Sequence, residues 1–538
     1  MKTRKTILAL VLVCALVLAL FAACTKTTPP EATTPSTNTE TKPAETEKPA
    51  ETEKPAETTE PEPESEPTVY DPEDYVTVKW QYFDLRMCGD DHGKRIEKAI
   101  NEYIGPKYGL QVELTFISIG DLRTKQQISI AGGEVLDLVH QSSFSRMLMD
   151  GMLMDITDLL AENAPDALAL MEPYMIAYSK DGRYYGIPTL RGYVKDSYFL
   201  MREDILDELG MTEKARNMET MGDFEEILEA VKVNYTDKGT GLYPFIKEGA
   251  RECIPGGLWD SDRLDSAHSY ETAEDTTGVV YAPEFGKLEY LYDDPRYEDK
   301  LIRAKKWRDS GWIWPDSNLT DIYGDELIKQ GIGFAYFTGA EYGVEVNKAT
   351  SVGFPVVCVK YLDGITTNGT LTARGSVVPI TSEEPAGACR LINALYTDAT
   401  LMNLITRGIE GEDYELVDGL IQYPEEAPHY YQADFLTGNN MLLIPLVGQE
   451  KNMYEIVNQI NQDAKISDYL GFSMDTSDLQ LLISQITAVN DQYTNDLRTG
   501  LYTPELYAEY KDKLAAAGVR EYIDALQNQV SAWIAANK

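Results

Sequence analysis

Apolar positions change spacing several times in the first part of the folded chain, and each change predicts a new element. Val76–Trp80 and Val112–Phe116 alternate apolar and polar residues, which is the pattern of a half-buried strand. Residues 96–104 and 122–130 place apolar side chains at helical spacing, and 136–139 is a short apolar run that reads as a third strand. Strand, helix, strand, helix and strand with short joints predict an α/β layer with a largely parallel sheet.

The remainder of the body mixes both spacings. Thr220 and Asp223 have the spacing of a capping box and predict the start of a helix over 224–231. Residues 240–259 are rich in glycine, proline and aromatic residues and predict a long loop. Further strands are expected at 184–188, 198–201, 352–359 and 375–380, and further helices at 152–160, 203–209, 300–307, 322–330 and through most of the chain after 386.

The first 68 residues follow neither spacing. Lys2, Arg4 and Lys5 precede an apolar run that ends at Ala23, and this order predicts a secretory signal over 1–23. The run is shorter than the ~20 apolar residues of a membrane-spanning helix, which argues against an uncleaved anchor. Cys24 follows two alanines, as in a bacterial lipobox, with Phe21 where such motifs usually carry leucine. We therefore expect a lipid on Cys24; cleavage after Ala23 without a lipid is the alternative.

A tether is expected over 24–68. Residues 25–67 consist almost entirely of threonine, proline, glutamate, alanine and lysine, and no large apolar residue is present to bury. An extended chain of this kind rises about 3 Å per residue and reaches on the order of 100 Å. A disordered tether and a glycosylated stalk both fit this composition.

The net charge and the absence of several sequence motifs reduce the number of function classes that fit the chain. The chain carries 88 acidic and 48 basic residues, with a formal net charge of −40. Such a body repels nucleic acid and other anionic partners, although acidity is also a common solubility device. Cys88, Cys253, Cys358 and Cys389 lie far apart and predict neither a zinc site nor a dense disulfide scaffold, and their pairing stays open. No H-E-x-x-H, P-loop, G-x-S-x-G or clear dinucleotide motif occurs, which favours a binding protein over an enzyme.

Several segments, taken in order, resemble one family. Ala131–Val139 resembles its "A-S-G-x-x-x-D-L-V" motif, Gly151–Leu160 its "G-x-L-x-D-L-T-x-L-L", and Asp181–Pro188 its "D-G-K-x-Y-G-I-P". The family is that of the extracellular solute-binding lipoproteins of ABC importers, the family 1 group that includes maltose-binding protein. Gly408–Gly411 and the end of the chain from Gly471 resemble a branch with a C-terminal domain of uncharacterised function.

The resemblance implies an α/β, two-lobed periplasmic-binding-protein-like (type II) fold whose lobes are joined by hinge strands. It implies no cofactor, no metal and no reaction, and we expect a monomer. The expected segments are a signal at 1–23, the tether at 24–68, lobe 1 from 69–190 plus 352–380, lobe 2 from 191–351 plus 381–470, and a C-terminal helical segment at 471–538 packed on the lobes.

Ligand-binding residues are expected where strands of such sheets end. The excess of 34 Tyr and 6 Trp over 13 Phe suits sugar, because these rings cover sugar faces and carry a polar group; packing in the core is the alternative for each one. The candidates are Tyr82, Phe83, Asp84 and Arg86 after the first strand, Ser142, Ser143 and Phe144 after the third, Arg191 at the lobe crossing, Trp259 and Tyr336 from the second lobe, and, by resemblance, Glu410.

The expected function is the capture of a neutral oligosaccharide, or of a peptide as a less favoured ligand, at the extracellular face of the cell membrane. Hinge closure would trap the ligand, and ABC permease subunits would receive it. Two other classes stay open: a secreted glycoside hydrolase with paired carboxylates about 5–10 Å apart, and a surface adhesion lipoprotein.

Overall fold

The computed structural model describes residues 69–84, 90–118, 120–248, 253–320, 322–424 and 429–537. The signal, the tether, Cys24, Arg86 and Cys88 lie outside the described residues. Among the helices within these ranges, none combines the length and apolar character that a membrane span requires.

The first sheet has five strands in the order β2-β1-β3-β15-β6. β1 runs parallel to both β2 and β3, whereas β15 runs antiparallel to β3 and to β6. The start of β15 therefore lies at the sheet edge where the other strands end. The strands are β1 (Val76–Asp84), β2 (Leu110–Ser118), β3 (Leu138–His140), β6 (Ile187–Pro188) and β15 (Gly375–Val377).

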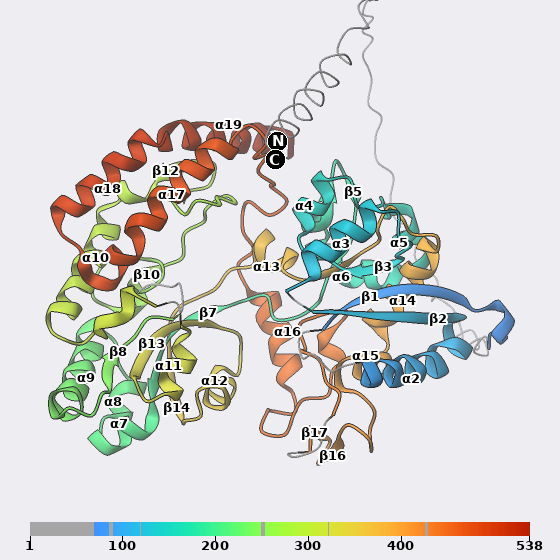
Figure 1. Cartoon of the computed structure of the whole chain (residues 1–538), viewed down its shortest axis with the longest axis horizontal. Helices are drawn as coiled ribbons and strands as arrows, with labels where there is room; N and C mark the ends of the chain where they lie inside the picture. Colours follow the sequence, from blue (N-terminus) through green and yellow to red (C-terminus); the bar gives the residue numbers. More distant parts are fainter. Residues whose placement is uncertain are drawn as a thin grey trace, which may run out of the picture. The chain divides into compact units, whose positions relative to one another are not determined.

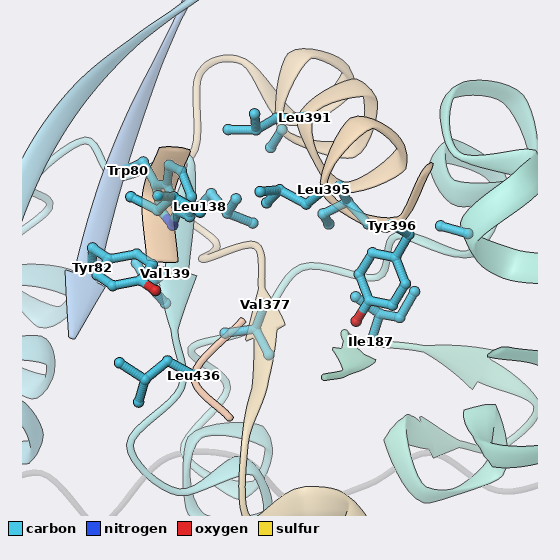
Figure 2. Close-up of a cluster of buried hydrophobic side chains, with 14 of the residues drawn as sticks. Trp80, Tyr82, Leu138, Val139, Ile187, Val377, Leu391, Leu395, Tyr396 and Leu436 are labelled. Atoms are coloured by element: carbon cyan, nitrogen blue, oxygen red, sulfur yellow. The ribbon is translucent and has the colours of Figure 1, made fainter. Parts of the chain in front are cut away.

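Helices from distant parts of the sequence cover this sheet and share one core with it. Trp80 and Tyr82 of β1 are each 1% exposed, and Leu391 and Leu395 of α14 are buried in the same cluster (Figure 2). Burying a large apolar side chain contributes about 1.5–3 kcal/mol, so this helix is a main support of the sheet. The helices are α2 (Asp90–Tyr108), α3 (Leu122–Ala131), α5 (Thr157–Asn163), α6 (Pro165–Met171), α14 (Pro385–Thr397) and α15 (Ala399–Arg407).

The second sheet has its own core and the strand order β14-β7-β13-β8. Phe199, Phe224, Phe245 and Trp307 pack there with ring centroids between 4.8 and 6.0 Å apart for the contacting pairs. The strands are β7 (Asp196–Arg202), β8 (Tyr243–Phe245), β13 (Gly333–Ala340) and β14 (Val356–Leu362), and the helices are α7 (Glu203–Leu209), α8 (Thr212–Arg216), α9 (Met221–Asn234), α10 (Pro295–Asp309), α11 (Gly324–Lys329) and α12 (Val344–Val352).

The capping box predicted at Thr220 is present. The Asp223 amide donates to Thr220 Oγ1 at 3.1 Å, and the Thr220 amide donates to Asp223 Oδ2 at 2.9 Å. The two bonds satisfy orphan donors at the start of α9, which explains why this helix begins where the sequence indicates.

The C-terminal helices pack against residues 254–304 (Figure 1). Tyrosines dominate the shared core, among them Tyr292, Tyr297 and Tyr510. Gly500 lies so close to α10 that a Cβ there would be 2.5 Å from the Ala304 carbonyl oxygen. The helices are α17 (Gln480–Asp496), α18 (Pro504–Ala516) and α19 (Val519–Asn537), with a π-helical turn at Leu497–Leu501.

Short elements complete the described chain. The remaining helices are α4 (Phe144–Met149), α13 (Asn368–Thr372) and α16 (Met453–Asp463), and the remaining strands pair as β4 (Ser179–Lys180) with β5 (Arg183–Tyr184), β9 (Leu258–Trp259) with β10 (Ala267–His268), β11 (Val280–Glu284) with β12 (Lys287–Tyr290), and β16 (Glu415–Val417) with β17 (Leu420–Gln422).

Three chain segments cross between the two sheets, and hydrogen bonds join them to one another. The Gly364 amide donates to Asp196 Oδ1 at 2.8 Å, which joins the first crossing to the second. The Thr366 amide donates to the Lys465 carbonyl at 2.9 Å, which joins the second to the third. We call the segments 193–196, 363–367 and 464–467 the hinge.

The lobe boundaries differ from those expected. Residues 352–380 were expected in lobe 1, but Val356–Leu362 pairs with β7 of the second sheet, and the chain recrosses the hinge only after it. Residues 381–470 were expected in lobe 2, but α14 and α15 lie in the core of the first sheet. The C-terminal helices share a core with residues 254–304 rather than resting on both lobes. Strand pairing over long sequence separations decides these boundaries.

Two predicted elements also shift. The helix expected over 152–160 begins only at Thr157, because Leu153 pairs with Pro379 in an isolated bridge. The strand expected over 352–359 begins at Val356, because Val352 ends α12. A long-range contact decides where the first element begins, and the end of the preceding helix decides where the second one begins.

We predict that Gly364→Ala destabilises the protein. A Cβ at this position would lie 2.5 Å from the Lys195 carbonyl oxygen and 2.8 Å from its nitrogen, and neither backbone atom can turn aside. Overpacking of this kind costs about 1–3 kcal/mol. Urea unfolding measures the loss, and Gly120→Ala is the control, since nothing lies within 4 Å of a Cβ at Gly120. Equal stability of the two variants would refute the hinge contact.

We also predict a pH-dependent loss for Asp398→Asn. Asp398 caps α15 through the Thr400 amide at 2.9 Å and accepts from Lys107 Nζ at 2.7 Å and Tyr108 Oη at 2.7 Å on α2. Burial opposes its ionisation, but these hydrogen bonds outweigh burial and hold the pKa of Asp398 below its ordinary value.

The charged form of Asp398 therefore stabilises the fold above the unfolded pKa of about 3.9, and this contribution is lost as pH falls through the lower folded pKa. Urea unfolding at pH 7 should show a loss of about 1–3 kcal/mol that shrinks at pH 3. The exposed Asp512→Asn serves as the control. A loss independent of pH would contradict this account.

Candidate functional site at the hinge

The carboxyl ends of strands from both sheets meet beside the hinge. Arg191 follows β6 of the first sheet, Glu341 follows β13 of the second, and Arg191 Nη1 lies 3.1 Å from Glu341 Oε1. Arg191 is 6% exposed and is held by two further bonds, from Nη1 to the Gly192 carbonyl at 3.0 Å and from Nη2 to the Thr370 carbonyl at 2.9 Å. Ligands of open α/β sheets bind at such strand ends.

Glu341 lies in a restricted space. Burial raises the pKa of its carboxyl group, and the charge of Arg191 lowers it in part. A Cβ at Gly192 would lie 2.8 Å from Glu341 Oε2, so the absence of a side chain at Gly192 permits this close approach. The close approach of this ion pair therefore depends on Gly192, directly before the first crossing.

Aromatic rings and a second arginine lie at the edge of the first sheet. The Arg374 guanidinium, just before β15, is 5.5 Å from the Phe83 ring centroid and 5.6 Å from that of Phe435. The His140 ring lies 5.6 Å from Phe83. Burial, together with the charge of Arg374, lowers the pKa of His140 to about 3, so this ring is neutral at physiological pH.

Buried amides fix the loops around these rings. Gln432 Nε2 donates to Asp84 Oδ1 at 3.1 Å, which ties the loop that carries Phe435 to the end of β1. Gln141 Nε2 donates to the Thr372 carbonyl at 2.5 Å, which ties the end of β3 to the segment before β15. We call Phe83, His140, Arg374 and Phe435 the sheet-edge cluster.

A groove of about 850 Å³ follows the hinge. Tyr342, next to Glu341, contributes to its wall and also donates from Oη to Glu450 Oε2 at 2.9 Å. The volume lies within the range of small-molecule sites. The wall is formed by Val194, Asp196, Tyr198, Ala267, His268, Ser269, Tyr342, Lys360, Leu362, Asp363, Gly364, Ile365, Ile460, Asp463, Ala464 and Lys465.

Several predicted binding residues lie at the sheet edge. Phe83 belongs to the sheet-edge cluster, Asp84 is bonded to Gln432, and Arg191 forms the ion pair. Ser142 and Ser143 are half-buried after β3. Their place at the strand ends agrees with the expectation, and ligand contact by any of them stays a prediction.

Other predicted residues are placed in ways that argue against ligand contact. Tyr82 is 1% exposed and packs edge-on against Trp80, and Phe144 is 4% exposed with its ring 4.3 Å from that of Tyr178. Tyr336 is fully buried and donates to the Asp325 carboxylate. For these three aromatics, the burial supports packing in the core.

Two further candidates, Trp259 and Glu410, lie elsewhere. Trp259 is half-buried on β9, where Nε1 donates to the Gly256 carbonyl at 2.9 Å and the ring lies 5.4 Å from Tyr361. Glu410 is exposed in the turn that Arg95 holds through Asp413. Arg86 lies outside the described residues.

Sequence reasoning missed Arg374, Phe435, Glu341 and Tyr342. Binding residues were expected in loops that follow strands, whereas Arg374 precedes a strand. Only the antiparallel direction of β15 brings Arg374 to the carboxyl edge of the sheet. An arginine directly before a predicted strand was a usable signal. Phe435 had no local signal, because it lies in an irregular loop.

Metal and thiol chemistry find no support in the described part of the chain. No group of three or more His, Cys, Asp or Glu residues there is arranged to hold a metal ion. No disulfide joins Cys253, Cys358 and Cys389 to one another, and burial raises the pKa of the Cys358 and Cys389 thiols to about 12.

Two α/β lobes with separate cores, joined by three crossings, define the fold of a two-lobed solute-binding protein. Residues 468–535 match the family model of a domain of unknown function, DUF3502. The chain is 23% identical over 437 residues to a "Carbohydrate ABC transporter substrate-binding protein" of Streptococcus pneumoniae serotype 4 (strain ATCC BAA-334 / TIGR4), covering 79% of this chain and 84% of the relative.

Solved structures agree with this fold. The N-glycan transport solute binding protein NgtS of Streptococcus pneumoniae matches with a TM-score of 0.73 and 20% identity, over 86% of this chain and all of NgtS. NgtS in complex with Man5GlcNAc matches with a TM-score of 0.62 and 19% identity, over 86% of this chain and 99% of that one. The two-lobed α/β fold and the family resemblance predicted from the sequence are confirmed.

We predict that Tyr82→Ala and Phe435→Ala differ strongly in stability. Tyr82 is enclosed in the core, so truncation should cost about 3–5 kcal/mol, as for other buried aromatics. Phe435 is half-buried at the edge and should cost about 1–2 kcal/mol. Urea unfolding of each variant measures the difference; similar losses would contradict the assignment of Tyr82 to the core.

Proposed function

We propose that this protein is the substrate-binding component of an ABC importer, and that it captures an oligosaccharide between its lobes and delivers it to permease subunits. The observation that carries the proposal is the Arg191–Glu341 pair, because it joins the carboxyl ends of β6 and β13 at 3.1 Å beside the hinge. Residues that close on a ligand from both lobes must lie near such a junction. Similar proteins are substrate-binding components rather than enzymes.

Hinge closure is the proposed mechanism. Each lobe has a core of its own, so rotation about the hinge leaves both cores intact. The TM-score is 0.73 with one NgtS structure and 0.62 with the complex of NgtS and Man5GlcNAc. A difference of this kind is expected when lobes of nearly constant structure change their relative orientation around a ligand.

The chemistry of the sheet edge suits a sugar. Phe435 and Tyr342 are half-buried and offer aromatic surface to the apolar faces of sugar rings. Arg374, Ser142 and Ser143 offer hydrogen-bond donors and acceptors for hydroxyl groups. Specificity follows because a buried polar group left unpaired costs about 1–3 kcal/mol. An oligosaccharide is favoured over a peptide, since the similar proteins are described as carbohydrate or N-glycan binders.

In this proposal, the N-terminal segment determines where the protein is located. A lipid on Cys24 holds the protein at the extracellular face of the membrane, and residues 25–67 act as a tether that lets the lobes reach both solution and permease. The protein acts as a monomer.

We predict that at least one oligosaccharide raises the melting temperature of the chain by several degrees without being cleaved. A ligand at 100 times its Kd stabilises by about 2.7 kcal/mol. A thermal-shift screen of plant, host and microbial glycans measures the shift, and a reducing-sugar assay checks for cleavage. New reducing ends would identify a hydrolase instead, and the absence of a shift across the panel would refute sugar capture.

Small-angle X-ray scattering on the best ligand tests closure separately. The radius of gyration should fall when the sugar is added. A melting shift without this change would retain sugar binding and refute hinge closure.

A further inference from the structure

Arg374 differs from its neighbour Arg191 in having no carboxylate partner among the described residues. Arg191 is paired with Glu341, whereas the hydrogen bond of Arg374 within the described chain runs from Nη1 to the Ala373 carbonyl at 2.5 Å. No carboxylate from those ranges lies within ion-pair distance of Arg374, and its buried Nε has no hydrogen-bond acceptor there. The guanidinium thus retains donor capacity that the described part of the chain leaves unused.

The two neighbouring rings restrict the guanidinium. Phe83 and Phe435 lie on it at 5.5 and 5.6 Å, and such contacts hold a planar cation at low entropic cost. Phe83 is 1% exposed, and Phe435 and Arg374 are half-buried, so the cation lies between the core and the solvent-exposed edge of the sheet. A group in this position is oriented before a ligand arrives.

The surroundings of Arg374 destabilise the charged form of its guanidinium group. Burial, and then the like charge of Arg191, lower the pKa of the Arg374 guanidinium. His140 is neutral and Tyr178 is protonated, because burial lowers the pKa of the imidazole to about 3 and raises that of the phenol. No neighbouring group in the described structure therefore compensates the charge, and an anion from outside would do so.

We propose that the sheet-edge cluster forms a subsite for a carboxylate-bearing sugar, such as a uronic or sialic acid unit, with Arg374 as the group that pairs with the carboxylate. The inference rests on the proposed sugar capture and replaces the expectation of a neutral sugar. The planar fork of a guanidinium matches a carboxylate with two parallel hydrogen bonds, which a hydroxyl group does not offer.

The net charge of −40 does not exclude an acidic ligand. At physiological ionic strength, exposed charges are largely screened beyond about 8 Å, so distant carboxylates mainly slow the encounter. The pair with Arg374 is formed at contact distance in a half-buried place, where screening is weak. Local pairing therefore decides affinity, and net charge decides the association rate.

Matched ligands test the proposal with the full chain. Isothermal titration compares trigalacturonic acid with its methyl ester, which has the same sugar backbone without the charges, and 3′-sialyllactose with lactose. We expect one acid to bind at least ten-fold more tightly than its neutral partner.

Variants locate the effect. Arg374→Gln should remove the preference for the acid, and Arg374→Lys should keep only part of it, because an ammonium group lacks the planar fork. Arg520→Gln is the matched control: Arg520 also stacks on a ring, that of Tyr290 at 4.7 Å, but it lies on α19 in the C-terminal helices. Melting temperatures of all variants confirm that each is folded.

Several results would overturn the subsite. If neutral members bind as tightly as their acids, or if Arg374→Gln keeps the preference, the carboxylate assignment is wrong. Binding of neutral glycans alone would refute the subsite and leave sugar capture intact. The failure of every glycan, acidic or neutral, would refute sugar capture itself.

Discussion

The main-chain contact between Lys195 and Gly364 is the constraint on which the two-lobed structure depends. The two segments lie so close that a single Cβ at Gly364 would meet three backbone atoms of Lys195. The third crossing pairs with the second through Thr366 and Ile466. Because the three segments contact one another along their main chains, a change in backbone angles at one of them is transmitted to the others. These contacts keep the crossing compact.

The segment that leads into the C-terminal helices is also bound to the hinge. Asn368, just after the second crossing, donates to the carbonyls of Tyr469 and Phe472 and accepts from the Gly471 amide. The start of the matched DUF3502 domain is thereby fixed to the hinge, while its helices share a tyrosine-rich core with residues 254–304. The domain enlarges the lobe of the second sheet and anchors the third crossing.

The local sequence pattern was sufficient to predict many elements of the fold but not the boundaries between the lobes. Strand β1, helix α9 with its capping box, and helix α7 lie where spacing and caps predict them, because nearby residues determine these elements. The assignment of β14 and α14 to lobes failed, since it depends on partners more than a hundred residues away. The same holds for the candidate site. The ends of predicted strands indicated Asp84 and Arg191, but Arg374 could be predicted only from the direction of β15. Aromatic composition alone did not distinguish Tyr82 and Tyr336, which are buried, from the half-buried Phe435.

Two arginines at one edge of the sheet illustrate how charge is distributed in an acidic protein. Arg191 holds the lobes together through Glu341, so its charge is used within the fold. Arg374 lies near enough to be repelled by Arg191, yet the described chain brings no acid to it, although acidic residues outnumber basic ones by 88 to 48. In such a chain a cation without a partner is held in place by packing, here between Phe83 and Phe435, at a cost to stability. A cost of this kind is expected at a binding site, where the ligand supplies the missing partner.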